Sequence, residues 1–449
     1  MSANKQRPGI WVVLAIVTTF LFWNGREPGW AEESKGAKQP RHYDADRGDV
    51  WNRLHAALFI RTDGTRNSFG HDEVDILVWP STSRHLVHEN SLGPAIAALK
   101  QFNRQDTSKV QARSPIARAL LQRDLWAAFD WAAELNVEGD TDRARAELRP
   151  LLHEAICKIA FTGTQIRELP DTYQQALHNK TFPASFDPSR PERPFLPSDL
   201  FDPSGAWVCI GETGIAQGDV QKKLAPIHVD HFSRSVFTVF LRLPEGRAQT
   251  LAYLSTLAEF PTPRVIENRR VELNKNLPEL PSGTQVALLR RAILIDDQAR
   301  PVPTRLVESL QLRIFDRPPS LAAEAPMRQS FVEFVLSPAA MLSGESGLRV
   351  IEEGEEGFTF LILRSSIDPF EEQAEQDYEV HRQGIHRSCQ ACHHDSGIRG
   401  LNVYTRAFGG DEGHPPLLAP TTPESREKVA VFWKQKRADW GIFRGMYER

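Results

Sequence analysis

The spacing of apolar residues divides the chain into stretches of different character. Between residues 49 and 180 apolar residues recur every three or four positions, which predicts helices. The clearest of these helices begins at Ser114-Pro115, with serine as the cap and proline in the first turn. Its apolar positions are Ala117, Leu120, Leu121, Leu125, Ala128 and Trp131. Residues 49–180 are therefore expected to form a mainly α domain.

Residues 206–365 carry short runs of β-branched and aromatic residues, which predict strands. The preceding stretch, 181–205, is rich in Pro, Ser and Asp and is expected to be a linker or long loop. The predicted strands cover residues 207–210, 235–241, 285–295, 310–315, 331–336 and 358–363, and one helix is expected at 251–257. This pattern predicts a central β-rich, sandwich-like domain, so the whole chain reads as a multidomain α+β protein.

Helical spacing returns in residues 366–449. Asp368-Pro369 is typical of a helix start, and an apolar stripe continues from it in steps of three and four residues. The stripe consists of Phe370, Ala374, Tyr378, His381, Ile385, Cys389 and Cys392. A second helix is expected to begin at Pro423. We therefore expect a small α-helical module over residues 366–449.

A C-x-x-C-H motif ends the apolar stripe. It consists of Cys389, Cys392 and His393, and this pentapeptide is the signature of covalent haem c attachment. Positions i, i+3 and i+4 share one face of a helical turn. Two thiols on that face can form thioethers with the two vinyl groups of one porphyrin, while the imidazole binds its iron. The motif predicts one haem c, with His393 as the proximal ligand.

The beginning of the chain has the layout of an export signal. Lys5 and Arg7 precede an apolar run, Ile10–Trp23, and Gly29-Trp30-Ala31 supplies small residues for cleavage after Ala31. The run has 14 residues, fewer than the ~20 that cross a bilayer, although an uncleaved N-terminal anchor is the alternative. We expect residues 1–31 to be a signal peptide, followed by a polar, disordered lead-in at 32–48. Export to the periplasm or beyond agrees with haem c, which is attached outside the bacterial cytoplasm.

The C-terminal module resembles c-type cytochrome domains. The resemblance rests on Cys389, Cys392 and His393, on the helix that leads into them and on a closing aromatic helix, and it covers under a fifth of the chain. It implies that the two cysteines carry the thioethers and that His393 binds the iron. The module departs from the common pattern because the only downstream methionine, Met446, follows the closing helix. A shortened module that uses the β-rich domain as its second wall would account for this departure.

The ligand on the other side of the iron stays open. Met446 would give a His/Met site with a raised potential, whereas a histidine would give a lower one. His414 and His228 lead the histidine candidates, ahead of His381, His386 and His231. An open position would permit ligand binding or peroxidase-like chemistry.

The expected function is single-electron transfer, with the upstream region docking a periplasmic redox partner. Two other classes of function fit the same residues. A haem enzyme would have an open iron and a nearby acid–base side chain. A binding or scaffold protein would carry no haem, and Cys389 and Cys392 would form a disulfide or join His393 at zinc.

Charge and the remaining cysteines refine this picture. The formal charge is −4, and about −6 without the leader, which argues against general nucleic-acid binding. No segment of the mature chain is a candidate membrane span. Residues 424–449 carry seven Lys or Arg against four Asp or Glu, an excess expected on a solvated helix. Cys157 and Cys209 lie in apolar surroundings, where they can be small hydrophobic residues or a disulfide.

Overall fold

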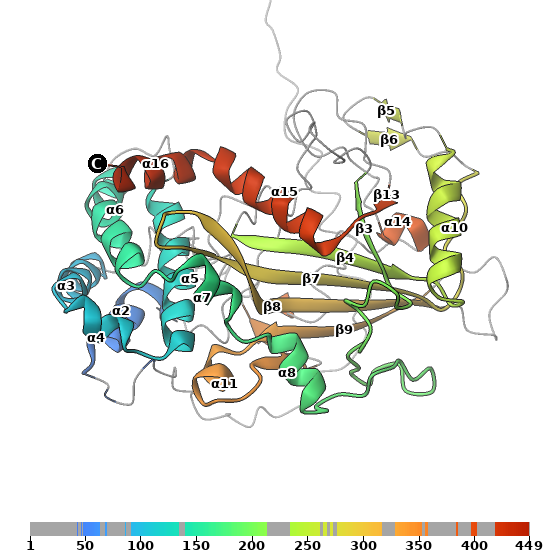
Figure 1. The fold of residues 1–449 in the computed structure, drawn as a ribbon, viewed down its shortest axis with the longest axis horizontal. Coiled ribbons are helices and arrows are strands. Elements are labelled where there is room, and N and C mark those ends of the chain that lie inside the picture. The colour runs from blue at the N-terminus through green and yellow to red at the C-terminus, as the bar shows by residue number, and fades with distance from the viewer. Residues whose placement is uncertain are drawn as a thin grey trace, which may run out of the picture. The chain divides into compact units, whose positions relative to one another are not determined.

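A seven-stranded antiparallel sheet forms the centre of the fold (Figure 1). The computed structural model describes residues 43, 46, 48–62, 68–69, 86, 91–133, 140–212, 234–260, 264–266, 270–272, 276–316, 328–352, 355–357, 383–384, 397–401 and 418–448. In spatial order the strands are β10 (Leu348–Val350), β9 (Arg328–Leu336), β8 (Pro301–Asp316), β7 (Thr284–Ile295), β4 (Ser235–Arg242), β3 (Val208–Glu212) and β13 (Leu418–Pro420). Six of the seven come from residues 208–350, and the edge strand β13 comes from near the C-terminus.

Both faces of the central strands are buried. On β8, Leu312 and Ile314 belong to one hydrophobic core, whereas Phe315 belongs to another, because successive side chains of a strand point to opposite faces. The first core receives Tyr173 from α8 (Thr172–His178) and Phe195 from the irregular segment 181–205. The second core is covered by α10 (Arg247–Ala258) and α14 (Gly397–Leu401).

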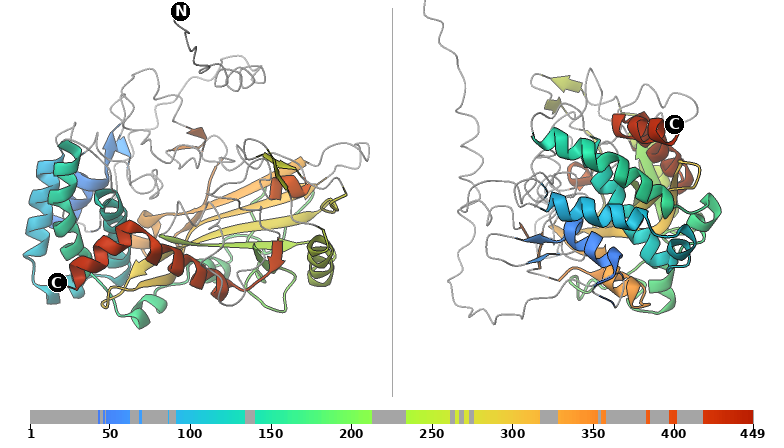
Figure 2. Two further views of the ribbon diagram at one scale, coloured as in Figure 1. Left: turned by 90° about the horizontal axis from the view of Figure 1, so that it is seen from above. Right: turned by 90° about the vertical axis from the view of Figure 1, so that its left-hand side faces the viewer.

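Helices from the first part of the chain gather at one end of the sheet (Figures 1 and 2). They are α2 (Val50–Phe59), α3 (Leu92–Asn103), α4 (Thr107–Gln111), α5 (Pro115–Ala132), α6 (Asp140–Lys158) and α7 (Gly163–Arg167). Helix α5 is at their centre, and almost all of its side chains are buried. Its Leu125 and Phe129 share a core with Leu294 at the end of β7.

The C-terminal helices join the sheet to these helices. Helix α15 (Pro423–Lys436) runs across the sheet, and α16 (Ala438–Tyr447) reaches α5 and α6 (Figure 2). Trp440 and Phe443 of α16 belong to the same core as α5 and the end of β7. Segments that the sequence divides among different domains thus contribute to one continuous core.

The mixed α+β class predicted from the sequence is confirmed, as are most of the individual elements. The predicted strands at 207–210, 235–241, 285–295, 310–315 and 331–336 match β3, β4, β7, β8 and β9, and the helix at 251–257 matches α10. The strand expected at 358–363 and the stripe from Phe370 to Cys392 lie outside the described residues. In the described part of the chain no second sheet packs on the first as a sandwich would require, because helices and segment 181–205 cover its faces.

Two stretches expected to be polar and unstructured contribute buried side chains. Segment 181–205 has no helix or strand, but Phe195, Leu196 and Leu200 are buried against the sheet. Tyr43, from the expected lead-in, is 7% exposed and donates a hydrogen bond to Asp124 at 2.6 Å. Across the helices that the structure describes, none combines the length and apolar character needed to span a bilayer.

A glutamine side chain ties α5 to the sheet. Gln122 is fully buried, its Nε2 donates to the carbonyl of Ile295 at 2.9 Å, and its Oε1 accepts from the amide of the same residue at 3.0 Å. The carboxamide thereby satisfies both backbone groups at the end of β7, which would otherwise be buried without partners.

Replacing this carboxamide should destabilise the fold. We expect Gln122→Leu to lower the free energy of unfolding by about 2–4 kcal/mol, because two buried backbone groups lose their partner. Urea unfolding of the mature chain measures the change, and Gln174→Leu, at an exposed position of α8, is the matched control. Equal stability of the two variants would show that the bridge contributes nothing.

Candidate functional site

The residues expected to bind haem, Cys389, Cys392 and His393, lie outside the described residues, as do His414 and His228. The remaining histidine candidates, His381, His386 and His231, lie outside them as well. Met446 is described: it lies on α16, is partly buried and packs against the core shared by α5, α6 and α16. The structure thus places one of the expected axial ligands, in a helical core.

Structural elements are described on both sides of the C-x-x-C-H motif. Upstream, β12 (Gln383–Gly384) pairs antiparallel with β11 (Glu356–Gly357). Downstream, α14 begins at Gly397, and its Ile398 is only 2% exposed. Ile398 packs in the core that contains Leu241 of β4 and Val286 of β7. The chain is therefore attached to the central sheet shortly after the motif, at Ile398, whereas β12 before the motif belongs to a separate two-stranded sheet with β11.

The sheet face that carries α14 becomes polar toward β9. Gln311 donates a hydrogen bond to Glu333, and the Arg313 guanidinium donates to Gln329 at 2.6 Å. The guanidinium carbon of Arg313 also lies 5.3 Å from the ring centre of Phe315. Gln311, Arg313 and Glu333 are each at most 6% exposed, so this polar row is buried. These polar groups satisfy one another on a face that is otherwise apolar.

A buried cluster of charges holds the C-terminal helices to α5. The Lys434 side chain is fully buried, and its Nζ lies 2.9 Å from both carboxylate oxygens of Asp130 and 2.6 Å from Asp439 Oδ2. Arg234 donates to Asp130 at 2.7 Å, and Arg437 donates to Asp439 at 3.2 Å. Three parts of the chain therefore meet in one network of charge-assisted hydrogen bonds.

The two carboxylates of this cluster have opposite pKa shifts. Burial and the neighbouring charge of Asp439 raise the pKa of Asp130 above its ordinary value, although Lys434 and Arg234 oppose them. Burial alone would also raise the pKa of Asp439, but Lys434 and Arg437 hold it well below the usual range. The cluster therefore keeps Asp439 ionised, while Asp130 is the carboxylate that takes up a proton first as the pH falls.

Sequence reasoning missed this cluster. The basic residues of 424–449 were expected to be solvated, but Lys434 and Arg426 are buried. A signal was present in the helical spacing, because Arg426, Ala430 and Lys434 follow one another at steps of four along the buried side of α15. Asp130, which Lys434 pairs with, is 304 residues away, so no local pattern marks this pairing.

A second buried network lies between α5 and the sheet. Asp124 accepts hydrogen bonds from Tyr43 Oη and, at 2.9 Å, from Arg123 Nε. On the sheet, Glu308 accepts from Ser235 at 2.5 Å, with Arg290 Nε 3.6 Å from its carboxylate. Burial, together with the charge of Asp124, raises the pKa of Tyr43 well above its ordinary value. This tyrosine stays protonated at neutral pH and acts as a hydrogen-bond donor.

Cys157 and Cys209 are both free thiols in the structure. Burial raises the pKa of Cys157 to about 11 and that of Cys209 to about 12. Because the thiolate is the reactive form, these two sulfurs are poor nucleophiles at neutral pH. Within the described residues, no group of three or more His, Cys, Asp or Glu side chains is placed to hold a metal ion.

Comparison with known proteins gives no relative for this arrangement: no family model matches the chain, and neither does any curated protein or solved structure.

Removing the buried lysine should destabilise the protein in a pH-dependent way. In Lys434→Met, Asp130 and Asp439 remain buried without their shared cation, so we expect a loss of about 3–5 kcal/mol at neutral pH. Without Lys434 the pKa values of both carboxylates rise above those of the unfolded chain. Their charged forms then destabilise the fold, and the penalty shrinks as the pH falls toward about 4 and they take up protons.

Unfolding in urea at a series of pH values measures this difference. Lys436→Met, at an exposed position two residues further along α15, is the control and should change stability by less than about 0.5 kcal/mol. A loss in Lys434→Met that stays constant with pH would contradict the account of the two carboxylates.

Proposed function

We propose that the protein is an exported haem c protein that transfers single electrons through one covalently bound haem. The observation that carries the proposal is the C-x-x-C-H motif of Cys389, Cys392 and His393 in a chain that begins with an export signal. Two thiols and an adjacent imidazole are the donor set for thioether attachment and axial ligation. When bound, the haem iron takes up and releases one electron. The chain then holds the porphyrin, excludes water from it and sets its potential.

The described anchors on both sides of the motif support this proposal. Gly384 precedes Cys389 by five residues and Gly397 follows His393 by four, so chain length alone keeps the motif within roughly 18 Å and 14 Å of these two glycines. A haem attached there would lie close to the sheet face on which Ile398 packs. We propose that residues 366–449 form a shortened cytochrome c-like module and that the sheet face under Ile398 is its second wall.

The free cysteines support the same assignment. Cys157 and Cys209 are unpaired and have raised pKa values, so neither is poised to react with a haem vinyl group. Cys389 and Cys392 are then the thiols available for attachment. A disulfide between them would leave His393 without the role that its place in the motif gives it.

The position of Met446 favours a histidine as the second axial ligand. Met446 packs against the helical core of α5, α6 and α16, whereas the anchor that follows the motif packs in a different core. We therefore propose His414 or His228 in this role, which implies a lower potential than a methionine would give. The acidic chain would act in the periplasm, where residues 49–365 dock the redox partner.

Haem staining tests the attachment directly. The full precursor is produced with a haem c maturation system, and we expect its band on a denaturing gel to stain for haem. The stain should disappear in the Cys389→Ser/Cys392→Ser double variant, because both thioether bonds are lost. Cys157→Ser is the matched control and should keep the stain, since that thiol takes no part in attachment. A wild-type tail peptide with the mass of its bare amino acids would refute the proposal.

Optical spectra then identify the axial ligands. We expect His393→Ala to keep the covalent haem but lose the low-spin spectrum of the reduced protein, because the iron loses its proximal imidazole. Met446→Leu should leave the spectrum unchanged, whereas either His414→Ala or His228→Ala should shift it. A change in Met446→Leu alone would instead assign the methionine.

A further inference from the structure

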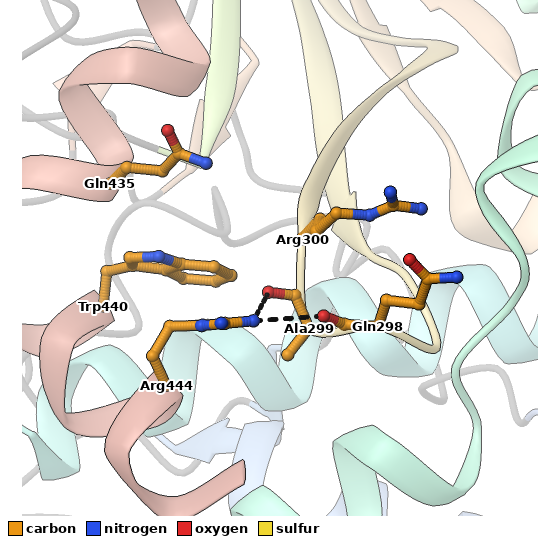
Figure 3. A pocket seen from close by; sticks show the side chains of 6 residues that line it. All are labelled: Gln298, Ala299, Arg300, Gln435, Trp440 and Arg444. Carbon is orange, nitrogen blue, oxygen red and sulfur yellow. Dashed lines mark hydrogen bonds between the residues drawn. The ribbon is translucent and has the colours of Figure 1, made fainter. Parts of the chain in front are cut away.

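A pocket of about 420 Å³ lies between the C-terminal helices and the tip of the β7–β8 hairpin (Figure 3). Its lining residues are Gln298, Ala299, Arg300, Gln435, Trp440 and Arg444. The volume falls in the range of small-molecule sites. The electron-transfer function proposed above gives this pocket no role.

Trp440 forms a rigid wall of the pocket. The residue is 5% exposed, and its indole stacks on Phe443 with the ring centres 5.5 Å apart and the planes 12° apart. Trp126 packs against it from another side, at 6.0 Å between ring centres. No described residue accepts a hydrogen bond from Trp440 Nε1, and this nitrogen lies on the ring edge that faces Gln435 (Figure 3). A nearly buried indole thus directs its one polar group into the pocket.

Gln435 and Arg300 are the other polar side chains of the pocket with groups not used in hydrogen bonds. The Gln435 carboxamide is exposed, lies on the same side of the pocket as Trp440 and has no hydrogen-bond partner in the described part of the chain (Figure 3). Arg300 has a side chain that is 56% exposed and pairs with Asp296, and its guanidinium points away from Trp440 and Gln435 (Figure 3). The N–H groups of Gln435 and Trp440 therefore remain as donors for a ligand.

Arg444 has a different role, because its guanidinium is already occupied. Nη1 donates to the carbonyls of Gln298 and Ala299 at 3.1 and 3.2 Å, and Nη2 donates to Glu448 at 2.7 Å. These bonds fix the hairpin tip against α16 and keep the pocket open at a constant width. Because Asp296 pairs with Arg300 and Glu448 with Arg444, the charge around the pocket is nearly balanced.

We infer that this pocket binds a small organic acid with a flat apolar body. Its carboxylate, which only accepts hydrogen bonds, would receive them from Trp440 Nε1 and the Gln435 carboxamide N–H. Its body would lie against the indole and the Ala299 methyl group. Doubly charged phosphate groups fit less well, because both arginines are already paired with carboxylates. A cationic ligand fits poorly, because the N–H groups of the pocket donate hydrogen bonds and a cation cannot accept them.

Titration of the mature full chain, labelled with ¹⁵N-tryptophan, tests this site with sodium benzoate as the probe. We expect one indole N–H resonance, the one missing from Trp440→Phe, to move and saturate. Benzamide has the same shape without the charge and should bind at least about tenfold more weakly, as expected for a hydrogen bond to a charged group. Gln435→Ala should weaken benzoate binding by a similar factor, and Gln174→Ala, on α8, should leave it unchanged.

Each outcome of this titration decides the proposal. Because Gln435 is exposed, its alanine variant keeps the fold and carries the test even if Trp440→Phe does not fold. The site is refuted if no indole resonance moves up to the solubility limit of benzoate. It is equally refuted if benzamide binds as tightly as benzoate, or if Gln435→Ala binds benzoate as tightly as the wild-type chain.

Discussion

The constraint on which this fold depends is that its central strands are apolar on both faces. Strands β7 and β8 have 12 and 16 residues, and nearly every side chain along them is buried. A sheet of this kind is stable only when both faces are covered, because exposing either would leave several hundred Å² of apolar surface in water. Elements close to the strands in sequence cover part of the two faces. Helix α8 and segment 181–205 pack on one face, and α10 packs on the other. The rest comes from the two ends of the chain.

The C-terminal part of the chain is therefore a structural component of the fold. It contributes an edge strand, β13, a helix that crosses the sheet, α15, and a helix, α16, that packs in the core shared with α5 and the end of β7. A haem module joined through a flexible linker would move freely, so the distance between its haem and a partner protein would vary. Here α14, which follows the C-x-x-C-H motif, is part of the same fold as the proposed docking region. The proposed electron transfer would be steeply sensitive to distance, and a fixed separation between haem and docking surface would suit it.

The sequence predicted the elements well and their association poorly. Strands such as 235–241 and 310–315 and the helix at Ser114-Pro115 follow from residues that are neighbours in the chain, and the structure confirms them. The three-residue strand β13 carries no such pattern, because its pairing with β3 is what makes it a strand. The Gln122 bridge and the Lys434 cluster likewise join residues 173 and 304 positions apart. Polar residues that are buried only after folding look, in sequence, like any solvated side chain.

The Lys434 cluster also explains why the pocket beside it has a fixed shape. An apolar contact between α15 and α5 would tolerate sliding, whereas Lys434 must meet Asp130 and Asp439 together, which only one placement of the two helices permits. Gln435 follows Lys434 in the chain, and Trp440 follows Asp439. The ion pairs that set the angle between α15 and α16 therefore also set the spacing between the two donors of the pocket. A buried charge cluster that costs desolvation energy is retained here, we argue, because it places those donors without relying on either side chain's own contacts.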